Sequence, residues 1–78
     1  MPRIYKKDVE KGLITFLEDG AIFQVHESHT AKIEKWIVGD VVDVAISENP
    51  TAPYTLTNPH SLDWVWASKI AASAMNGG

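Results

Sequence analysis

The sequence predicts an all-β fold, a small antiparallel barrel of about five short strands. Short apolar and β-branched runs recur along the chain, separated by turn residues at intervals of roughly 8–12 residues. The middle of the chain shows no helical periodicity. Both an SH3-like and an OB-like barrel satisfy this pattern.

The first hairpin is the clearest local signal. Leu13–Leu17 and Ala21–Val25 are apolar runs that flank Glu18-Asp19-Gly20. Asp-Gly favours a two-residue type I′ turn, because both turn positions need a positive φ. Such a turn predicts two cross-strand pairs on one face, Phe16 with Phe23 and Ile14 with Val25.

The middle of the chain predicts a loop and then a strand. The stretch 26–32 is polar and indicates a loop with one helical turn. Gly39-Asp40 is a second turn signal. After it, the alternation points Val42, Val44 and Ile46 to one face of a strand and Asp43 to the other.

The last third predicts two more strands. Two prolines in Ser47–Pro53 indicate a surface loop, because proline cannot donate to a central strand. Tyr54–Asn58 and Asp63–Ile70 then form strands on either side of a turn at Pro59-His60-Ser61. We therefore expect an extended N-terminal segment over residues 1–11, the barrel over 12–70 and a flexible tail over 71–78.

Composition excludes several classes of protein. The chain has 78 residues and no cysteine, so it is a single domain without disulfides or thiolate zinc sites. Its formal charge of −3 argues against binding nucleic acid through the overall field. No apolar run is long enough for a membrane helix, and the first residues include no apolar h-region of a signal peptide. We therefore expect a cytoplasmic protein, or an exported one whose leader has been removed.

The candidate chemistry is sparse. His26 and His29 are three residues apart and would share a metal on a helical turn, but a third ligand is not apparent, so we expect no metal or other cofactor. The serines lack a Gly-x-Ser-x-Gly elbow, and the chain is too short to wall a deep pocket. We therefore expect a protein that is not an enzyme.

The candidate binding residues are aromatic: Trp64, Trp66 and Tyr54. Trp64 and Trp66 are two apart and project from the same face of a strand. An inward face makes them core, and we expect at least one to be buried against Val42, Val44 and Phe23. An outward face makes them a platform for a peptide, a glycan or a base.

Three pieces of the sequence carry a resemblance. They are Glu18-Asp19-Gly20-x-x-Phe23-x-Val25, Trp36-x-x-Gly39-Asp40-x-Val42-x-Val44, and Tyr54-x-Leu56-x-Asn58 leading to Val65-x-Ala67. From about Leu13 to Ile70 the chain resembles a group of small bacterial proteins, often exported, that share a DG hairpin and W-x-x-GD-x-V-x-V and Y-x-L-x-N strands. The resemblance implies the β fold and brings no known reaction with it.

We therefore expect an interaction module that presents an edge strand or an aromatic patch to a protein partner. The first alternative is a nucleic-acid-binding domain of the OB-like or SH3-like kind. The second is a small metal-binding protein or metal-dependent enzyme. Salt-dependent oligonucleotide binding and elemental analysis, respectively, distinguish these alternatives.

Overall fold

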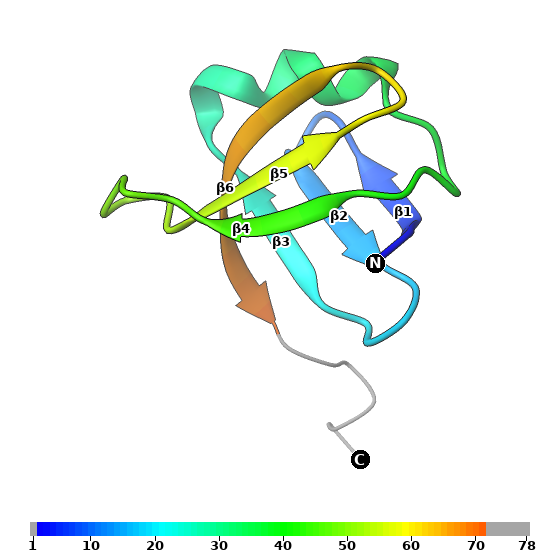
Figure 1. The fold of residues 1–78 in the computed structure, drawn as a ribbon, viewed down its shortest axis with the longest axis horizontal. Helices are drawn as coiled ribbons and strands as arrows, with labels where there is room; N and C mark the ends of the chain where they lie inside the picture. The colour runs from blue at the N-terminus through cyan, green and yellow to red at the C-terminus, as the bar shows by residue number, and fades with distance from the viewer. Residues whose placement is uncertain (1, 72–78) are drawn as a thin grey trace.

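The computed structural model describes residues 2–71 and forms a strongly curved antiparallel sheet, covered at one end by a short helix (Figure 1). The described elements, in chain order, are β1 (Ile4–Asp8), β2 (Leu13–Phe16), β3 (Ile22–Val25), η1 (Glu27–Lys35), β4 (Asp43–Ile46), β5 (Tyr54–Asn58) and β6 (Asp63–Ala71). The all-β prediction is confirmed. The polar stretch after β3, expected to be a loop with one helical turn, is a longer 3₁₀ helix.

The six strands form one sheet in the order β1-β2-β3-β6-β5-β4. Two meanders, β1-β2-β3 and β4-β5-β6, are joined by pairing of β3 with β6, which is a Greek-key arrangement. In the described residues the sheet does not close into a barrel, since no ladder joins β4 to β1. Near these two edge strands one isolated bridge joins Arg3 to Val41, and backbone hydrogen bonds link Pro2 to Val42 and Ile4 to residues 39 and 40.

The predicted hairpin strands are present, but the predicted register is wrong by two residues. Ile14 lies opposite Phe23, and the Phe16 N–H donates to the Ala21 carbonyl at 2.9 Å, so the loop spans four residues, 17–20. Of the two turn residues Asp19 and Gly20, only Gly20 has a positive φ, +69°. A type I′ turn needs a positive φ at both positions.

The N-terminal segment explains the longer loop. Arg3 binds both carboxylate oxygens of Glu18, through its backbone N–H at 2.9 Å and its Nε at 2.8 Å, and its carbonyl accepts from the N–H of Leu17 at 2.9 Å. These contacts hold Leu17 and Glu18 away from the β2–β3 ladder. A shift of two residues preserves the face, so Phe16 and Phe23 still meet, with ring centroids 5.4 Å apart.

The core lies inside the curve of the sheet. Trp36 is 1% exposed and is the largest fully buried side chain. The remaining buried apolar residues come from every strand except β4, from η1 and from the connections: Ile4, Ile14, Phe16, Ala21, Phe23, Val25, Ile33, Val42, Ala52, Leu56, Val65 and Ala67.

Lys7 fastens η1 to the sheet. Its ammonium donates to the carbonyls of Ile33 at 2.9 Å and Glu34 at 2.8 Å, and also to that of Trp36. A cation at the C-terminal end of a helix satisfies carbonyls that have no partner within the helix.

Residues 4–8, expected to be part of an extended lead-in, belong to the sheet as β1. Of the expected tail, residues 72–78 lie outside the described residues.

Within residues 2–71, no helix has the length and apolar character needed to cross a membrane.

Candidate functional site

Trp64 and Trp66 point out of the sheet, not into it. Val65 and Ala67 are fully buried, and because successive residues of a strand face opposite sides, the two indoles lie on the outer face of β6. Trp64 is 42% exposed, and Trp66 is partly exposed. The expectation that one of them is buried against Val42, Val44 and Phe23 is therefore wrong.

The reason lies in the pairing of β6. Val65 is paired with Leu56, and both are fully buried, so the ladder with β5 fixes which side of β6 faces the core. Trp36 and the two phenylalanines already fill that space, and only the small side chains of β6 fit beside them.

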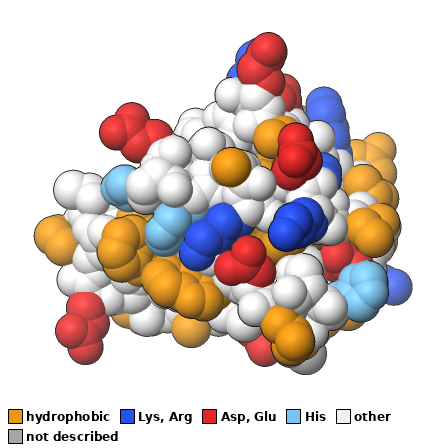
Figure 2. All heavy atoms as spheres, turned by 90° about the horizontal axis from the view of Figure 1, so that it is seen from above, with side chains coloured by type: hydrophobic (Ala, Val, Ile, Leu, Met, Phe, Trp, Pro, Cys, Tyr) orange, Lys and Arg blue, Asp and Glu red, His pale blue; other side chains and the backbone are white. Residues whose placement is uncertain are grey.

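Two histidines from the start of η1 extend the aromatic surface. The ring centroids of His29 lie 5.2 Å from Trp64 and 5.0 Å from Trp66, and His26 lies 5.7 Å from Trp66. The two indoles are 5.8 Å apart. We call these four residues, His26, His29, Trp64 and Trp66, the aromatic platform. Figure 2, which views the face that carries η1, shows hydrophobic side chains next to two histidines and basic side chains.

His29 is fixed by the backbone of β6. Its Nδ1 accepts a hydrogen bond from the backbone N–H of Trp66 at 3.0 Å, so the ring is neutral with its proton on Nε2. Burial, and then the charges of Lys32 and His26, lower the pKa of His29, while the carboxylate of Asp63 opposes them. A neutral His29 presents an N–H donor and an aromatic face to a ligand.

Lys32 borders the platform. Its Nζ lies 4.6 Å from the Trp64 ring centroid and 3.6 Å from the carboxylate of Asp63, and it donates to the Trp64 carbonyl at 3.3 Å. The ammonium holds Trp64 in place through a cation–π contact. Because Asp63 offsets its charge, the platform is predominantly apolar.

Tyr54, the third candidate binding residue, lies elsewhere. It is half-buried on the inner side of β5, and its ring packs edge-on against Phe23 with centroids 5.4 Å apart. The structure therefore brings Trp64 and Trp66 together and separates Tyr54 from them. Sequence reasoning missed Lys32 as a residue that borders the platform. Its spacing of three from His29 is the signal, because residues three apart in a 3₁₀ helix share a face.

His26 and His29 are neighbours, with ring centroids 6.0 Å apart. The His26 Nδ1 lies 2.7 Å from the Ser28 hydroxyl, and the His29 Nδ1 faces Trp66, so one ring nitrogen of each is engaged. Among residues 2–71 no group of three metal-ligating side chains comes together. As aromatic rings against Trp66, both histidines complete the platform.

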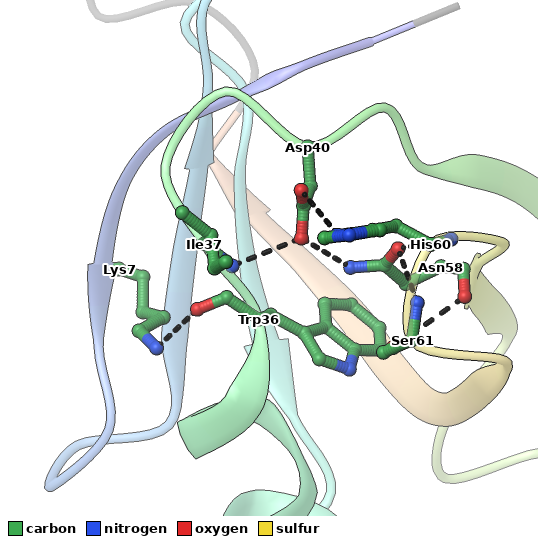
Figure 3. A network of polar contacts seen from close by, with 7 residues as sticks. All are labelled: Lys7, Trp36, Ile37, Asp40, Asn58, His60 and Ser61. Carbon is green, nitrogen blue, oxygen red and sulfur yellow. Dashed lines mark hydrogen bonds and ion pairs between the residues drawn. The ribbon is translucent and has the colours of Figure 1, made fainter.

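A polar cluster around Asn58 lies apart from the platform, where two loops meet (Figure 3). The side chain of Asn58, fully buried, donates to Asp40 Oδ2 at 2.8 Å and accepts from the backbone N–H groups of His60 at 2.9 Å and Ser61 at 3.3 Å. Asp40 Oδ2 also accepts from the N–H of Ile37 at 3.0 Å. Asn58 thereby ties the loop before β4 to the turn after β5.

The same cluster contains a carboxylate–imidazole pair. His60 Nδ1 lies 3.2 Å from Asp40 Oδ1. The hydrogen bond from Asn58 is the main cause that lowers the pKa of Asp40. The hydroxyl of Ser61 donates to the Asn58 carbonyl at 3.5 Å, and among the described residues no hydroxyl is hydrogen-bonded to the His60 ring. The arrangement orders two loops and lacks the nucleophile–base contact of acyl-transfer sites.

One hollow lies on the outer face of the first meander. Its volume is about 190 Å³, and its lining residues come from β1 to β3 and the β1–β2 turn: Lys6, Asp8, Lys11, Leu13, Thr15 and Ile22. Small-molecule sites usually enclose about 300–1,000 Å³. This hollow is thus smaller than a usual ligand site. Of the strands that line it, only β3 pairs with β6, and its lining residue Ile22 lies opposite Ala71, at the other end of β6 from Trp64 and Trp66.

Comparison of the chain with protein-family models, with curated proteins and with solved structures finds no match. The geometry of the platform is therefore the main basis for a functional proposal.

Proposed function

We propose that this protein is a non-enzymatic interaction module that binds an extended segment of a partner protein on its aromatic platform. The observation that carries the proposal is the outward orientation of Trp64 and Trp66 on β6. Two adjacent indoles held partly in water form an apolar surface of the kind that marks binding sites. Tryptophan is also the residue most enriched where partner proteins gain binding energy.

The rings suit a proline-rich or otherwise apolar extended peptide. Peptides in the polyproline II conformation dock on aromatic surfaces of small β domains, since they are already extended and lose little entropy on binding. The platform offers the required parts: indole faces for proline rings, and N–H donors on His29 and the indoles for peptide carbonyls. The Lys32–Asp63 pair at its border adds little net charge.

Titration with a proline-rich peptide of about ten residues, followed by two-dimensional NMR, tests the proposal. We expect the indole N–H signals of Trp64 and Trp66 to shift. Trp64→Ala should weaken binding at least about tenfold, a change of about 1.4 kcal/mol. Leu17→Ala is the matched control, because Leu17 is 51% exposed on the β2–β3 loop, away from η1. Equal effects of the two substitutions on binding, or peptide-induced shifts of NMR signals only from residues outside the platform, would rule out the proposed peptide site.

Single-stranded nucleic acid is the second candidate, and the position of Lys32 over the Trp64 ring favours it. Bases stack on aromatic rings, and nearby cations bind the phosphates. The overall charge of −3 and the Asp63 carboxylate work against it. Titration with oligothymidylate at two salt concentrations separates the candidates, because nucleic-acid affinity falls steeply with salt, whereas an apolar peptide contact changes little.

We also propose that the curved sheet behaves as a small barrel of the SH3-like or OB-like kind. Three backbone hydrogen bonds beside the Arg3–Val41 bridge support this: Ile4 to Asp40, Gly39 to Ile4 and Val42 to Pro2, at 2.9, 2.8 and 2.9 Å. Slow hydrogen exchange at the Val42 N–H in solution would support the closure, and rapid exchange there would contradict it.

A further inference from the structure

β4 is an edge strand whose residues are all exposed. The other five strands each carry at least one buried residue, but Asp43–Ile46 carries none. Val44 is 38% exposed and Ile46 is 80% exposed, although both share the inner face of the sheet with Val42, which is fully buried. The inner face of β4 therefore extends past the core as an uncovered apolar strip.

Among residues 2–71, some backbone groups of β4 also have no hydrogen-bond partner. The Ser47 N–H donates to the Pro53 carbonyl at 2.7 Å, so this pair is a hydrogen-bonded pair of the β4–β5 ladder. Hydrogen-bonded and non-hydrogen-bonded pairs alternate in an antiparallel ladder. Val44 and Ile46 consequently form non-hydrogen-bonded pairs with β5, and their N–H and C=O groups point to the free edge.

Val42, two residues before Val44, confirms that the backbone groups of these alternate residues point to the edge. Its N–H donates at 2.9 Å to the carbonyl of Pro2, which lies on the edge side of β4. The same edge continues past Val44 and Ile46, where the described part of the chain provides no strand. Among β4 residues, only Asp43 carries a charge that would discourage another strand from pairing there.

A second copy of β4 complements this edge. In an antiparallel pair with a two-fold axis at Ala45, Val44 of one copy lies opposite Ile46 of the other. Those are the residues whose backbone groups face the edge, so all four pairs of edge groups form hydrogen bonds. Asp43 then lies opposite Ser47, so no like charges meet.

Other registers satisfy the edge less well. A two-fold axis at Val44 would require the N–H of Val42, which already binds Pro2. An axis at Ile46 would pair Val44 with Glu48, beyond the end of the strand. In the register at Ala45, the N–H and C=O groups of both Val44 and Ile46 form hydrogen bonds across the interface. This register also brings the two exposed apolar side chains together.

We propose that the protein forms a two-fold symmetric homodimer through antiparallel pairing of β4 with β4 of a second copy, which joins the two sheets into one. This interface is separate from the aromatic platform, so each copy keeps its own peptide surface. The contact is isologous, and it therefore closes at two copies without forming fibres.

Sedimentation equilibrium of the full chain over a concentration series tests the dimer. We expect the wild type to dimerise, and Ile46→Lys to weaken the association at least tenfold, since it removes the apolar contact and brings a charge to the edge. Leu62→Lys is the matched control, because Leu62 is also a highly exposed apolar residue, 89%, and lies in the turn before β6. Circular dichroism verifies that both variants are folded. A monomeric wild type at a few hundred micromolar, or equal loss in both variants, would overturn the proposal.

The register has its own test. The chain has no cysteine, so Ala45→Cys introduces a single thiol at the proposed axis, opposite its own copy. Cβ atoms of a non-hydrogen-bonded pair lie within reach of a disulfide. We expect mild oxidation to give a covalent dimer much faster for Ala45→Cys than for Leu62→Cys. Equal rates would overturn the β4 register, and pairing of β4 with an added foreign strand in a monomeric protein would overturn the self-association.

Discussion

The imidazole of His29 accepts the hydrogen bond from the backbone N–H of Trp66 that the carbonyl of a neighbouring strand would otherwise accept. The β3–β6 ladder ends at the pair Val25 and Ala67, and the next residue, His26, still donates its N–H to the Trp66 carbonyl at 2.8 Å. The carbonyl of His26 is unavailable in return, because it accepts from the His29 N–H at 2.8 Å in the first turn of η1. His29 Nδ1 supplies the missing acceptor.

This relationship predicts that stability falls as the solution is made acidic. The pKa of His29 is lowered in the folded state, so between that value and the ordinary value of about 6.5 the unfolded chain binds more protons. The stabilisation is complete above pH 6.5 and is lost as the pH falls below it toward the folded pKa. Lys32 and His26 add to this effect, and Asp63 opposes it. Urea unfolding at a series of pH values measures the dependence.

His29→Asn separates the hydrogen bond from the titration. The amide oxygen of asparagine can accept from the Trp66 N–H but does not bind a proton near neutral pH. We expect a flatter stability profile below pH 7 in this variant. His60→Gln is the control, because that imidazole lies outside the platform. An unchanged slope in His29→Asn would show that other groups cause the acid sensitivity.

Lys7→Met should lower the free energy of unfolding by about 1–3 kcal/mol, because the last carbonyls of η1 and that of Trp36 lose a charged donor. Methionine keeps most of the aliphatic length, so the loss reports the ammonium. Lys6→Met on the same strand is the control, since Lys6 is exposed and makes no hydrogen bond among the described residues. Thermal and urea unfolding of the two variants give the comparison, and equal losses would contradict the role of Lys7.

Asn58→Ala should cost about 1–3 kcal/mol of stability, because it removes a fully buried donor to Asp40 and leaves two backbone N–H groups without an acceptor in a partly buried site. The amide side chain of Asn49 binds Thr51 within the surface loop before β5, and Asn49→Ala should cost less than about 1 kcal/mol. Chemical denaturation measures both. A similar small loss for the two asparagines would mean that the buried cluster contributes little.

Gly12→Ala should destabilise the protein more than Gly39→Ala. Both glycines have a positive φ, +69° and +99°, which costs an alanine about 1 kcal/mol or more. At Gly12 a Cβ would also lie 2.7 Å from Thr30 Cγ2, whereas nothing lies within 4 Å at Gly39. Urea unfolding compares the two variants.

A double variant isolates the steric part of the Gly12 effect. Thr30→Ser removes the methyl group and keeps the hydroxyl that donates to the Glu27 carbonyl. Gly12→Ala should therefore cost less in the Thr30→Ser background than alone. Additive losses would show that the close contact relaxes without cost.

The sequence by itself determined the strands β2 to β6 and the faces of the first hairpin, whereas β1 was expected to be part of an extended lead-in. Tyr54–Asn58 matches β5, and Asp63–Ile70 matches β6 to within one residue, because alternation and turn residues act locally. The pairing of Phe16 with Phe23 was wrong in register but correct in face, because a two-residue shift preserves the alternation.

Only the tertiary structure decided which way the last strand faces. Both sides of β6 are apolar, one with indoles and the other with Val65 and Ala67, so the local pattern fits either orientation. The choice came from distant residues: Leu56 pairs with Val65, Trp36 occupies the centre, and His29 reaches Trp66 from η1. Such contacts depend on the volume available inside the whole sheet and on hydrogen bonds between segments far apart in the chain, and no local pattern records either of them.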